Sequence, residues 1–301
     1  RVILAEDKSR FGGSLLTSEV TIGNQSGKEW AEKIISELKS MPNVVVKNRS
    51  QVFGYYDHNM LVMSERVSDH LPKTEKYTPK QRLWYIRAKE VIISSGSIER
   101  PLVFGNNDTP GVMLSSAAKE YLKIYGVLVG KKPLIFTNND SGYETAIEFK
   151  KNGINPIVLD TRKDPNSEII KEAKALNINI KPSYVVVAAK GYKKVNSADI
   201  AKISDDKKNI TNIENIKCDC ICVSGFWTPT IHLASQSGNK TKFNEDIDAF
   251  VPGTSKQNET TLGAANGSFT LEETLKSSFE TGHALSKKIT NKNNEISIPN
   301  V

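Results

Sequence analysis

Residues 133–160 read PLIFTNNDSGYETAIEFKKNGINPIVLD, and this stretch decides the fold. Its apolar run at 133–137 predicts a buried strand, residues 142–152 a helix, and residues 156–160 a second strand that ends in an acid. In a dinucleotide-binding βαβ unit the acid stands about 20 residues past the turn that follows the first strand. The stretch therefore predicts a parallel sheet of the Rossmann type.

The first seven residues, RVILAED, resemble the second strand of such a unit. Glu6 would take the ribose hydroxyls, but no Gly-rich turn and helix precede it in this sequence. We therefore expect the chain to be an internal piece of a larger protein, whose opening unit lacks its first strand, phosphate loop and first helix here. Taken alone, residues 1–16 fit an ordinary edge strand followed by a charged turn equally well.

The segment that follows mixes one helix with several short strands. Ser26-Gly-Lys-Glu29 is a capping box, which predicts the start of a helix. Short apolar runs separated by polar residues predict a β-meander inserted between helix and strand, at residues 44–46, 52–56, 60–63 and 83–88. A buried strand at 89–96 then ends in small residues, which would let the backbone approach a ligand closely.

These patterns predict an α/β protein with two nested Rossmann-like domains of the FAD/NAD(P)-binding kind. The first, truncated at its N-terminus, would comprise residues 1–129 and 224–290, and the second residues 130–223. Residues 291–301 are Asn-rich and unpatterned, so we expect a linker to a C-terminal domain outside this sequence. A length of 301 residues with 38% hydrophobic content suits two moderate cores.

Composition excludes several classes of function. The net charge of +7 comes from lysines scattered without a dense run, so we expect a solvated surface and no nucleic-acid partner. No apolar stretch approaches the ~18 residues of a membrane span, so we expect a cytoplasmic protein without a membrane partner. Cys218, Cys220 and Cys222 alternate along one strand, which predicts three buried small hydrophobes on one face rather than a redox pair or metal site.

The two nested units resemble the architecture of two-domain flavoprotein disulfide reductases. Against that pattern, the loop of the second unit has Thr137 and Asn139 where the first two glycines would stand, and Asp140 would repel a pyrophosphate. We therefore predict that the second unit does not bind NAD in the usual way. In the first unit Gly263-Ala264 replaces the Gly-Asp pair typical of these flavoproteins, which favours NAD over FAD.

A closer resemblance rests on long, unusual strings. Taken in their order along the chain, they resemble the α subunits of heterotetrameric sarcosine oxidases: residues 100–113 (RPLVFGNNDTPGVM), 137–143 (TNNDSGY), 224–236 (SGFWTPTIHLASQ) and 263–267 (GAANG). Phe226 stands where that family usually has Gly. The resemblance implies a central NAD-binding region, preceded by a small ferredoxin-like module and followed by a folate-binding domain.

The resemblance also implies which residues hold the cofactor. Glu6, with Asp7 beside it, would contact the adenosine ribose; Val52 would lie beside the adenine. The phosphates would lie near Arg10, Gly12, Gly13 and Ser14, and the pocket would be walled by Ser95, Gly96 and Ser97 and closed by Gly263, Ala264, Ala265 and Asn266. The sequence offers no catalytic residue and no set of metal ligands.

In that family the complex demethylates sarcosine to glycine oxidatively, with peroxide formation and transfer of the one-carbon unit to tetrahydrofolate. The resemblance implies β, γ and δ subunits as partners, NAD in the first domain, FAD and FMN on or near the β subunit, and tetrahydrofolate on the C-terminal domain. The fragment itself would be inactive. Two alternatives stay open: a flavin-dependent pyridine-nucleotide reductase, and a structural domain with a vestigial pocket.

Overall fold

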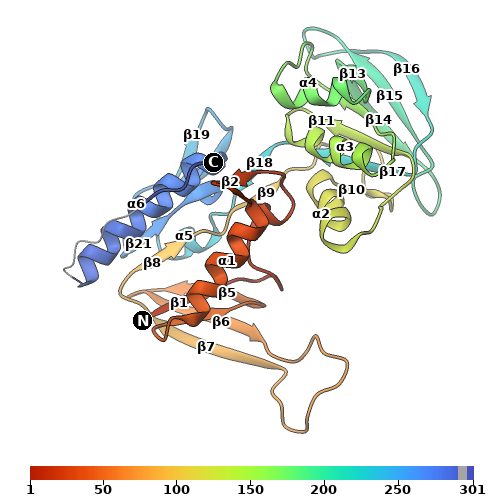
Figure 1. Ribbon diagram of the computed structural model, residues 1–301. Helices are drawn as coiled ribbons and strands as arrows, with labels where there is room; N and C mark the ends of the chain where they lie inside the picture. The colour runs from red at the N-terminus through yellow and green to blue at the C-terminus, as the bar shows by residue number, and fades with distance from the viewer. Residues whose placement is uncertain (291–296) are drawn as a thin grey trace. The chain divides into compact units, whose positions relative to one another are not determined.

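The computed structural model describes residues 1–290 and 297–301 and divides the chain into two compact units (Figure 1). Unit 1 comprises Arg1–Ile98 and Thr228–Val301, and unit 2 comprises Glu99–Trp227. Two short strands, β9 (Ser97–Glu99) and β18 (Trp227–Pro229), lie where the chain passes between the units. The predicted α/β class is confirmed.

Unit 1 contains two parallel strand pairs and an antiparallel meander. Its parallel pairs are β1 (Val2–Ala5) with β4 (Val44–Lys47), and β8 (Val91–Ile93) with β21 (Glu259–Thr261). Its meander is β5 (Ser50–Tyr56), β6 (Met60–Arg66) and β7 (Gln81–Arg87). Its remaining elements are β2 (Thr21–Ile22), β3 (Gln25–Ser26), β19 (Thr241–Asn244), β20 (Ala249–Pro252), α1 (Gly27–Ser40), α5 (His232–Gln236), α6 (Leu271–Thr290) and the 3-10 turns η1 (Gly13–Leu16) and η2 (Gly263–Asn266).

The predicted capping box begins α1 as expected. The Ser26 hydroxyl accepts a hydrogen bond from the Glu29 amide at 3.3 Å, and the Glu29 carboxylate accepts one from the Ser26 amide at 3.0 Å. One prediction for unit 1 was wrong: the run at 44–46 was assigned to the meander, but as β4 it pairs in parallel with β1. A fully apolar triplet suits a parallel strand better than an alternating meander strand.

Unit 2 is built on one parallel sheet in the order β10-β17-β11-β12-β13. These strands are β10 (Val112–Leu114), β11 (Pro133–Thr137), β12 (Ile157–Asp160), β13 (Asn179–Pro182) and β17 (Cys220–Ser224). The helices are α2 (Ser115–Tyr125), α3 (Ser141–Lys151) and α4 (Glu168–Ala175), and a separate antiparallel sheet holds β14 (Tyr184–Lys190), β15 (Ser197–Ile203) and β16 (Ile210–Ile216). The βαβ stretch that the sequence predicted is β11-α3-β12.

The second unit begins earlier than the sequence predicted. Sequence patterns placed its start at residue 130, whereas the structural boundary falls at Glu99. The reason is that β10 pairs with β17, in the register Val112↔Ile221, and so belongs to the second sheet. A strand of three residues is too short to show its sheet in the sequence. Of the predicted linker, residues 291–296 lie outside the described residues, and the Asn300 carbonyl accepts a hydrogen bond from the Gly23 amide at 2.7 Å.

The cysteines are buried as predicted, but they do not share one face. Cys220 and Cys222 pack in the cluster that includes Tyr143 and Phe149 of α3, whereas Cys218 packs in the cluster on the opposite side, with Phe104. Cys218 precedes β17, so the alternation of the strand does not extend to it. Burial raises the pKa of the Cys218 thiol to about 12, which keeps it protonated and unreactive at neutral pH.

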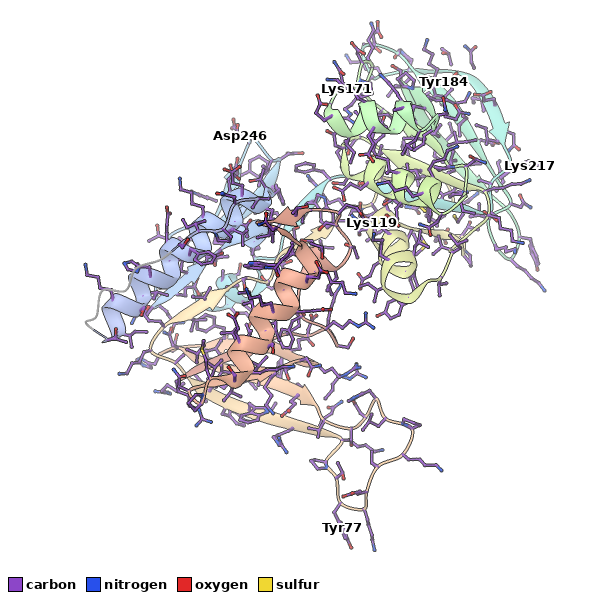
Figure 2. The ribbon with its side chains drawn as sticks, in the orientation of Figure 1. Tyr77, Lys119, Lys171, Tyr184, Lys217 and Asp246 are labelled. Atoms are coloured by element: carbon purple, nitrogen blue, oxygen red, sulfur yellow. The ribbon has the colours of Figure 1, made fainter. Side chains whose placement is uncertain are left out.

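Lysines lie on the surface, many of them beside acids. Figure 2 shows Lys171 and Lys217 pointing outward from unit 2, and Lys171 pairs with Glu168 at 2.6 Å. Within the described residues, no helix combines the length and the apolar character needed to cross a bilayer, and no group of three or more His, Cys, Asp or Glu side chains is placed to hold a metal ion.

Candidate functional site

The predicted cofactor residues of unit 1 lie at the carboxyl ends of its parallel strands. Glu6 follows β1, Ser95 to Ser97 follow β8, and Gly263 to Asn266 follow β21. In open α/β sheets, ligands bind in the crevice outside these strand ends. Leu15 of η1 and Leu275 of α6 belong to one buried cluster, which ties the loop after β1 to the helix after β21.

Glu6 is held in place by the backbone around it. Its amide donates to the Lys47 carbonyl at 2.9 Å, its carbonyl accepts from the Ser50 amide at 2.8 Å, and its carboxylate accepts from the Lys8 amide at 3.0 Å. Burial, and then the neighbouring Asp7, raises the pKa of Glu6, and the hydrogen bond from Lys8 offsets part of this rise. A carboxylate with one bond to an amide keeps lone pairs for two hydroxyl donors, which suits a ribose diol.

Glycines shape the loop after β1. Gly12 has φ +125° and Gly13 has φ +52°, both in the region that favours glycine. A Cβ atom on Gly12 would also lie 2.9 Å from Cδ2 of Leu16, so the position lacks room for a side chain. Arg10 is exposed and Ser14 is the second residue of the 3-10 turn, so both lie beside a tightly turned backbone.

The loop after β8 is partly committed to internal contacts. The Ser95 hydroxyl donates to the Thr230 carbonyl at 2.8 Å, and the Thr230 amide donates to the Gly96 carbonyl at 2.9 Å. Gly96 has φ +73° and open space where a Cβ would stand. The Ser95 hydroxyl is therefore already bonded within the chain, and the Gly96 backbone is the part of this predicted pocket wall that has open space beside it. Ser97 begins β9.

The loop after β21 forms the turn η2, which consists of the residues predicted to close the pocket. The Leu262 amide donates to the Ile93 carbonyl at 2.9 Å, which places the turn directly beside the end of β8. Ala265 is fully buried, whereas Ala264 and Asn266 lie nearer the surface, and the role of these residues in closing the pocket stays a prediction. A 3-10 turn has three residues per turn and directs one of its side chains inward. Val52 likewise packs against the core cluster around Tyr55 and Val91.

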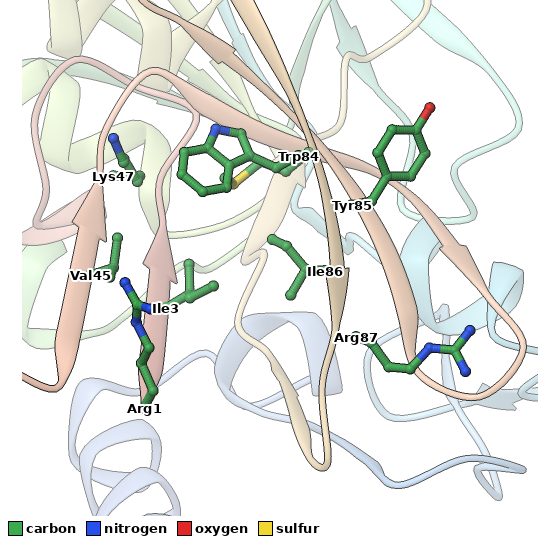
Figure 3. Close-up of a pocket in the computed structure, with 9 residues that line it drawn as sticks. Arg1, Ile3, Val45, Lys47, Trp84, Tyr85, Ile86 and Arg87 are labelled. Atoms are coloured by element: carbon green, nitrogen blue, oxygen red, sulfur yellow. The ribbon is translucent and has the colours of Figure 1, made fainter.

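Unit 1 also contains a cavity over one face of the β1–β4 pair, and its parallel strands have free edges. Among the described residues β1 pairs only with β4, and β8 only with β21, so each has one free edge. The cavity, of about 300 Å³, lies between this parallel pair and the meander, and Figure 3 shows Ile3, Val45, Trp84 and Ile86 around it. Its lining is largely apolar.

Sequence reasoning missed Glu99, which is 3% exposed in unit 2. Its carboxylate accepts a hydrogen bond from the Ser116 amide at 2.7 Å, in the first turn of α2. Burial raises the pKa of Glu99, and hydrogen bonds from Ser116 partly oppose the rise. The only signal in the sequence is one acid before a proline-containing loop, which does not reveal burial.

Two nested units, and loops at the carboxyl ends of the parallel strands in unit 1, place this chain in the class of two-domain, dinucleotide-binding folds. L-proline dehydrogenase from P. horikoshii superposes with a TM-score of 0.60 at 18% identity, over 99% of this chain and 56% of that one. Thioredoxin reductase from T. acidophilum superposes with a TM-score of 0.63 at 14% identity, over 89% of this chain and 91% of that one. These similarities concern the fold, and no family model matches the sequence.

In sequence, the chain is homologous to part of the α subunit of sarcosine oxidase, as the predicted resemblance indicated. The α subunit from Rhizobium meliloti (strain 1021) is 37% identical over 267 residues, which cover 88% of this chain and 26% of that protein. The α subunit from Corynebacterium sp. (strain P-1) is 30% identical over 288 residues, covering 94% of this chain and 30% of that protein. The chain thus spans less than a third of the length of these relatives.

Proposed function

We propose that unit 1 binds the adenosine end of a dinucleotide and that the chain is the dinucleotide-binding region of a sarcosine oxidase α-like subunit. The observation that carries the proposal is Glu6, fixed by three backbone hydrogen bonds at the carboxyl end of β1. The positive φ angles of Gly12, Gly13 and Gly96 support the proposal, because glycine backbone without a side chain lets a ligand approach closely. Ala264, in place of an acid, favours NAD over FAD.

At the level of the whole protein we propose the activity of the relatives. The complex would oxidise sarcosine at its CH–NH bond, form peroxide and pass the one-carbon unit to tetrahydrofolate on a separate C-terminal domain. The β, γ and δ subunits would be partners, FAD and FMN would lie on or near β, and the protein would be cytoplasmic. This chain would bind NAD and would not itself oxidise the amine. Sequence homology to sarcosine oxidase α subunits supports this assignment.

Replacing Glu6 with glutamine in the full-length protein should weaken NAD binding about tenfold, because a hydrogen bond to a charged acceptor is worth about 1.5–3 kcal/mol. Calorimetric titration measures the dissociation constant. The exposed Glu32 of α1, changed to glutamine, is the control and should leave binding unchanged. Equal affinity in the Glu6 and Glu32 variants would exclude the proposed ribose contact.

The same variant has a distinct pH profile. The raised pKa of Glu6 means that its carboxylate gains a proton at a higher pH than an ordinary glutamate does. NAD binding to the unsubstituted protein should therefore weaken as pH falls through this raised pKa, while binding to Glu6→Gln stays flat. No NAD binding at any pH would favour a vestigial pocket, and a yellow protein with stoichiometric flavin would favour a reductase.

We further propose that an additional parallel strand, supplied by a longer form of the protein, lies between β1 and β8. The Val2 and Glu6 amides bond to the β4 side, so by alternation the Ile3 and Ala5 amides face the free edge. In β8 the Val91 amide bonds toward β21, which leaves the Ile92 amide facing outward. Val2, at 55% exposed, and Ile92, at 47%, would be covered by such a strand.

Hydrogen exchange tests the added strand. In the longer protein the amides of Ile3, Ala5 and Ile92 should exchange at least about a hundredfold more slowly than in residues 1–301, because strand pairing protects them. The Val2 and Val91 amides, bonded in both forms, serve as internal controls. Unchanged exchange at Ile3, Ala5 and Ile92 would contradict the proposed strand.

A further inference from the structure

Unit 2 has the strand order that forms, in Rossmann-type sheets, the crevice where dinucleotides bind. In its strand order β11 lies between β17 and β12, so the sheet extends from β11 in both directions. At the carboxyl ends of β11 and β17, Thr137 pairs with Ser224. Such a switch point is where ligands bind in open α/β sheets. The loop after β11 and the start of α3 would face the pyrophosphate.

The Asn139 side chain fills this crevice. Its amide nitrogen donates to the Ser224 carbonyl at 3.0 Å, and its amide oxygen accepts from the Ser141 backbone amide at 2.9 Å. Asn139 is only 8% exposed, and it thereby bridges the end of β17 to the first residue of α3. The Ser141 amide, which could otherwise bind a phosphate oxygen, is satisfied from within the chain.

Thr137, the last residue of β11, holds the same loop through two hydrogen bonds to Asn139. Its hydroxyl donates to the Asn139 carbonyl at 2.8 Å and accepts from the Asn139 amide at 3.1 Å. A Cβ atom on Gly142 would lie 2.7 Å from Cβ of Thr137, so the loop packs tightly against the helix start. The space that glycines leave open for a pyrophosphate is therefore occupied by two side chains.

The acid that would take the ribose is occupied as well. Asp160, at the end of β12, is fully buried and accepts hydrogen bonds from the Tyr143 hydroxyl and from Arg162 Nη2, both at 2.8 Å. Arg162 Nη1 also pairs with Oδ1 of Asp140 at 2.8 Å. One guanidinium thus joins the acid of the second strand to the loop of the first.

We infer that unit 2 is a dinucleotide fold whose binding crevice is occupied by its own side chains. The Asn139 side-chain amide bonds to the Ser141 amide, which a phosphate would otherwise contact. Arg162 pairs with both Asp160 and Asp140, so the acid that would otherwise bind the ribose is already paired. This inference concerns unit 2 alone, so it stands independently of the NAD site proposed in unit 1. It limits the chain to at most one dinucleotide and identifies the residues that close the second site.

Hydrogen exchange of the full chain with and without millimolar NAD tests this inference. In the unsubstituted protein, NAD should leave exchange at residues 137–143 unchanged. In the double variant Asn139→Gly/Asp140→Ala, which removes the bridge and the loop charge, NAD should slow exchange there, with an affinity gain of about tenfold or more. Asp164→Ala, a matched charge change at an exposed acid of the same unit, should behave like the unsubstituted protein.

Either of two results would overturn the inference. One is protection of residues 137–143 by NAD in the unsubstituted protein, a measurement that does not depend on any variant folding. The other is a folded opened variant that NAD still does not protect; Asn139→Gly alone provides a milder form if the double variant unfolds. Exchange at the loop after β1, recorded in the same experiment, reports on unit 1 separately, so failure of one site is distinguished from failure of the other.

Discussion

Replacing Arg162 with alanine should lower the free energy of unfolding of unit 2 by about 3 kcal/mol, the largest effect we expect from a single charged residue in the chain. The variant leaves the fully buried Asp160 with hydrogen bonds from the Tyr143 hydroxyl and the backbone amide of residue 162, but without its cation. Burial opposes the charge on Arg162, but hydrogen bonds and ion pairs with Asp160 and Asp140 outweigh it and raise the pKa of the guanidinium. Removing that cation leaves an uncompensated buried carboxylate.

Native-state hydrogen exchange in β12 measures this effect, because two units need not unfold together. Arg162→Lys keeps the charge but loses the planar, bidentate geometry, so its loss should be intermediate. Lys163→Ala is the matched control: its ion pair with Asp205 is exposed, with side chains 73% and 75% accessible, and should contribute less than about 1 kcal/mol. Equal losses at Arg162 and Lys163 would show that the pairing with Asp160 does not stabilise unit 2.

In unit 1, Asn59→Ala should lower the free energy of unfolding by about 3 kcal/mol, since three hydrogen bonds of a buried side chain disappear. The Asn59 side chain accepts from the Tyr55 hydroxyl at 2.8 Å and donates to the Lys89 and Asn258 carbonyls at 3.2 and 3.1 Å. It therefore joins the meander to the segments that lead into β8 and β21. Without it, the buried Tyr55 hydroxyl and two carbonyls lose their partner.

His58→Ala is the control for this prediction. His58 has φ +61° and Asn59 has φ +52°, so alanine meets a similar backbone penalty at both positions, but His58 is exposed. The difference between the two variants isolates the buried hydrogen bonds, and exchange of the β8 amides measures it. A difference below about 1 kcal/mol would mean that solvent replaces the Asn59 contacts.

The sequence predicted the regular elements well where local chemistry determines them. The capping box at Ser26 and Glu29 begins α1, and the run at 133–137 is the fully buried β11. The prediction failed where pairing partners lie far away. β4 was assigned to the meander and β10 to the first domain, because a short apolar run does not indicate which strand it will meet.

In the candidate site too, features with local sequence signals could be predicted, whereas features that depend on distant parts of the chain could not. Glu6, Gly96 and Gly263 could be chosen from the sequence because an acid at a strand end and a glycine at a turn have local signatures. The burial of Ala265 could not be predicted from the sequence, because it depends on the 3-10 turn that directs this side chain into the core. Glu99 and Asn59 were missed because burial of a polar side chain depends on elements that arrive from distant parts of the chain.

By itself the sequence determined the class of this protein: hydrophobic periodicity and strand-end acids specify two nested dinucleotide folds, and Thr137, Asn139 and Asp140 indicate that the second loop is altered. Only the tertiary structure decided what those residues do instead. Asn139 meets Ser224, which lies 85 residues away along the chain, and Arg162 joins Asp140 to Asp160. Hydrophobic periodicity in the sequence indicates which face of a helix or strand is buried. The hydrogen-bond partners of a polar side chain depend instead on how strands from distant parts of the sequence pack together.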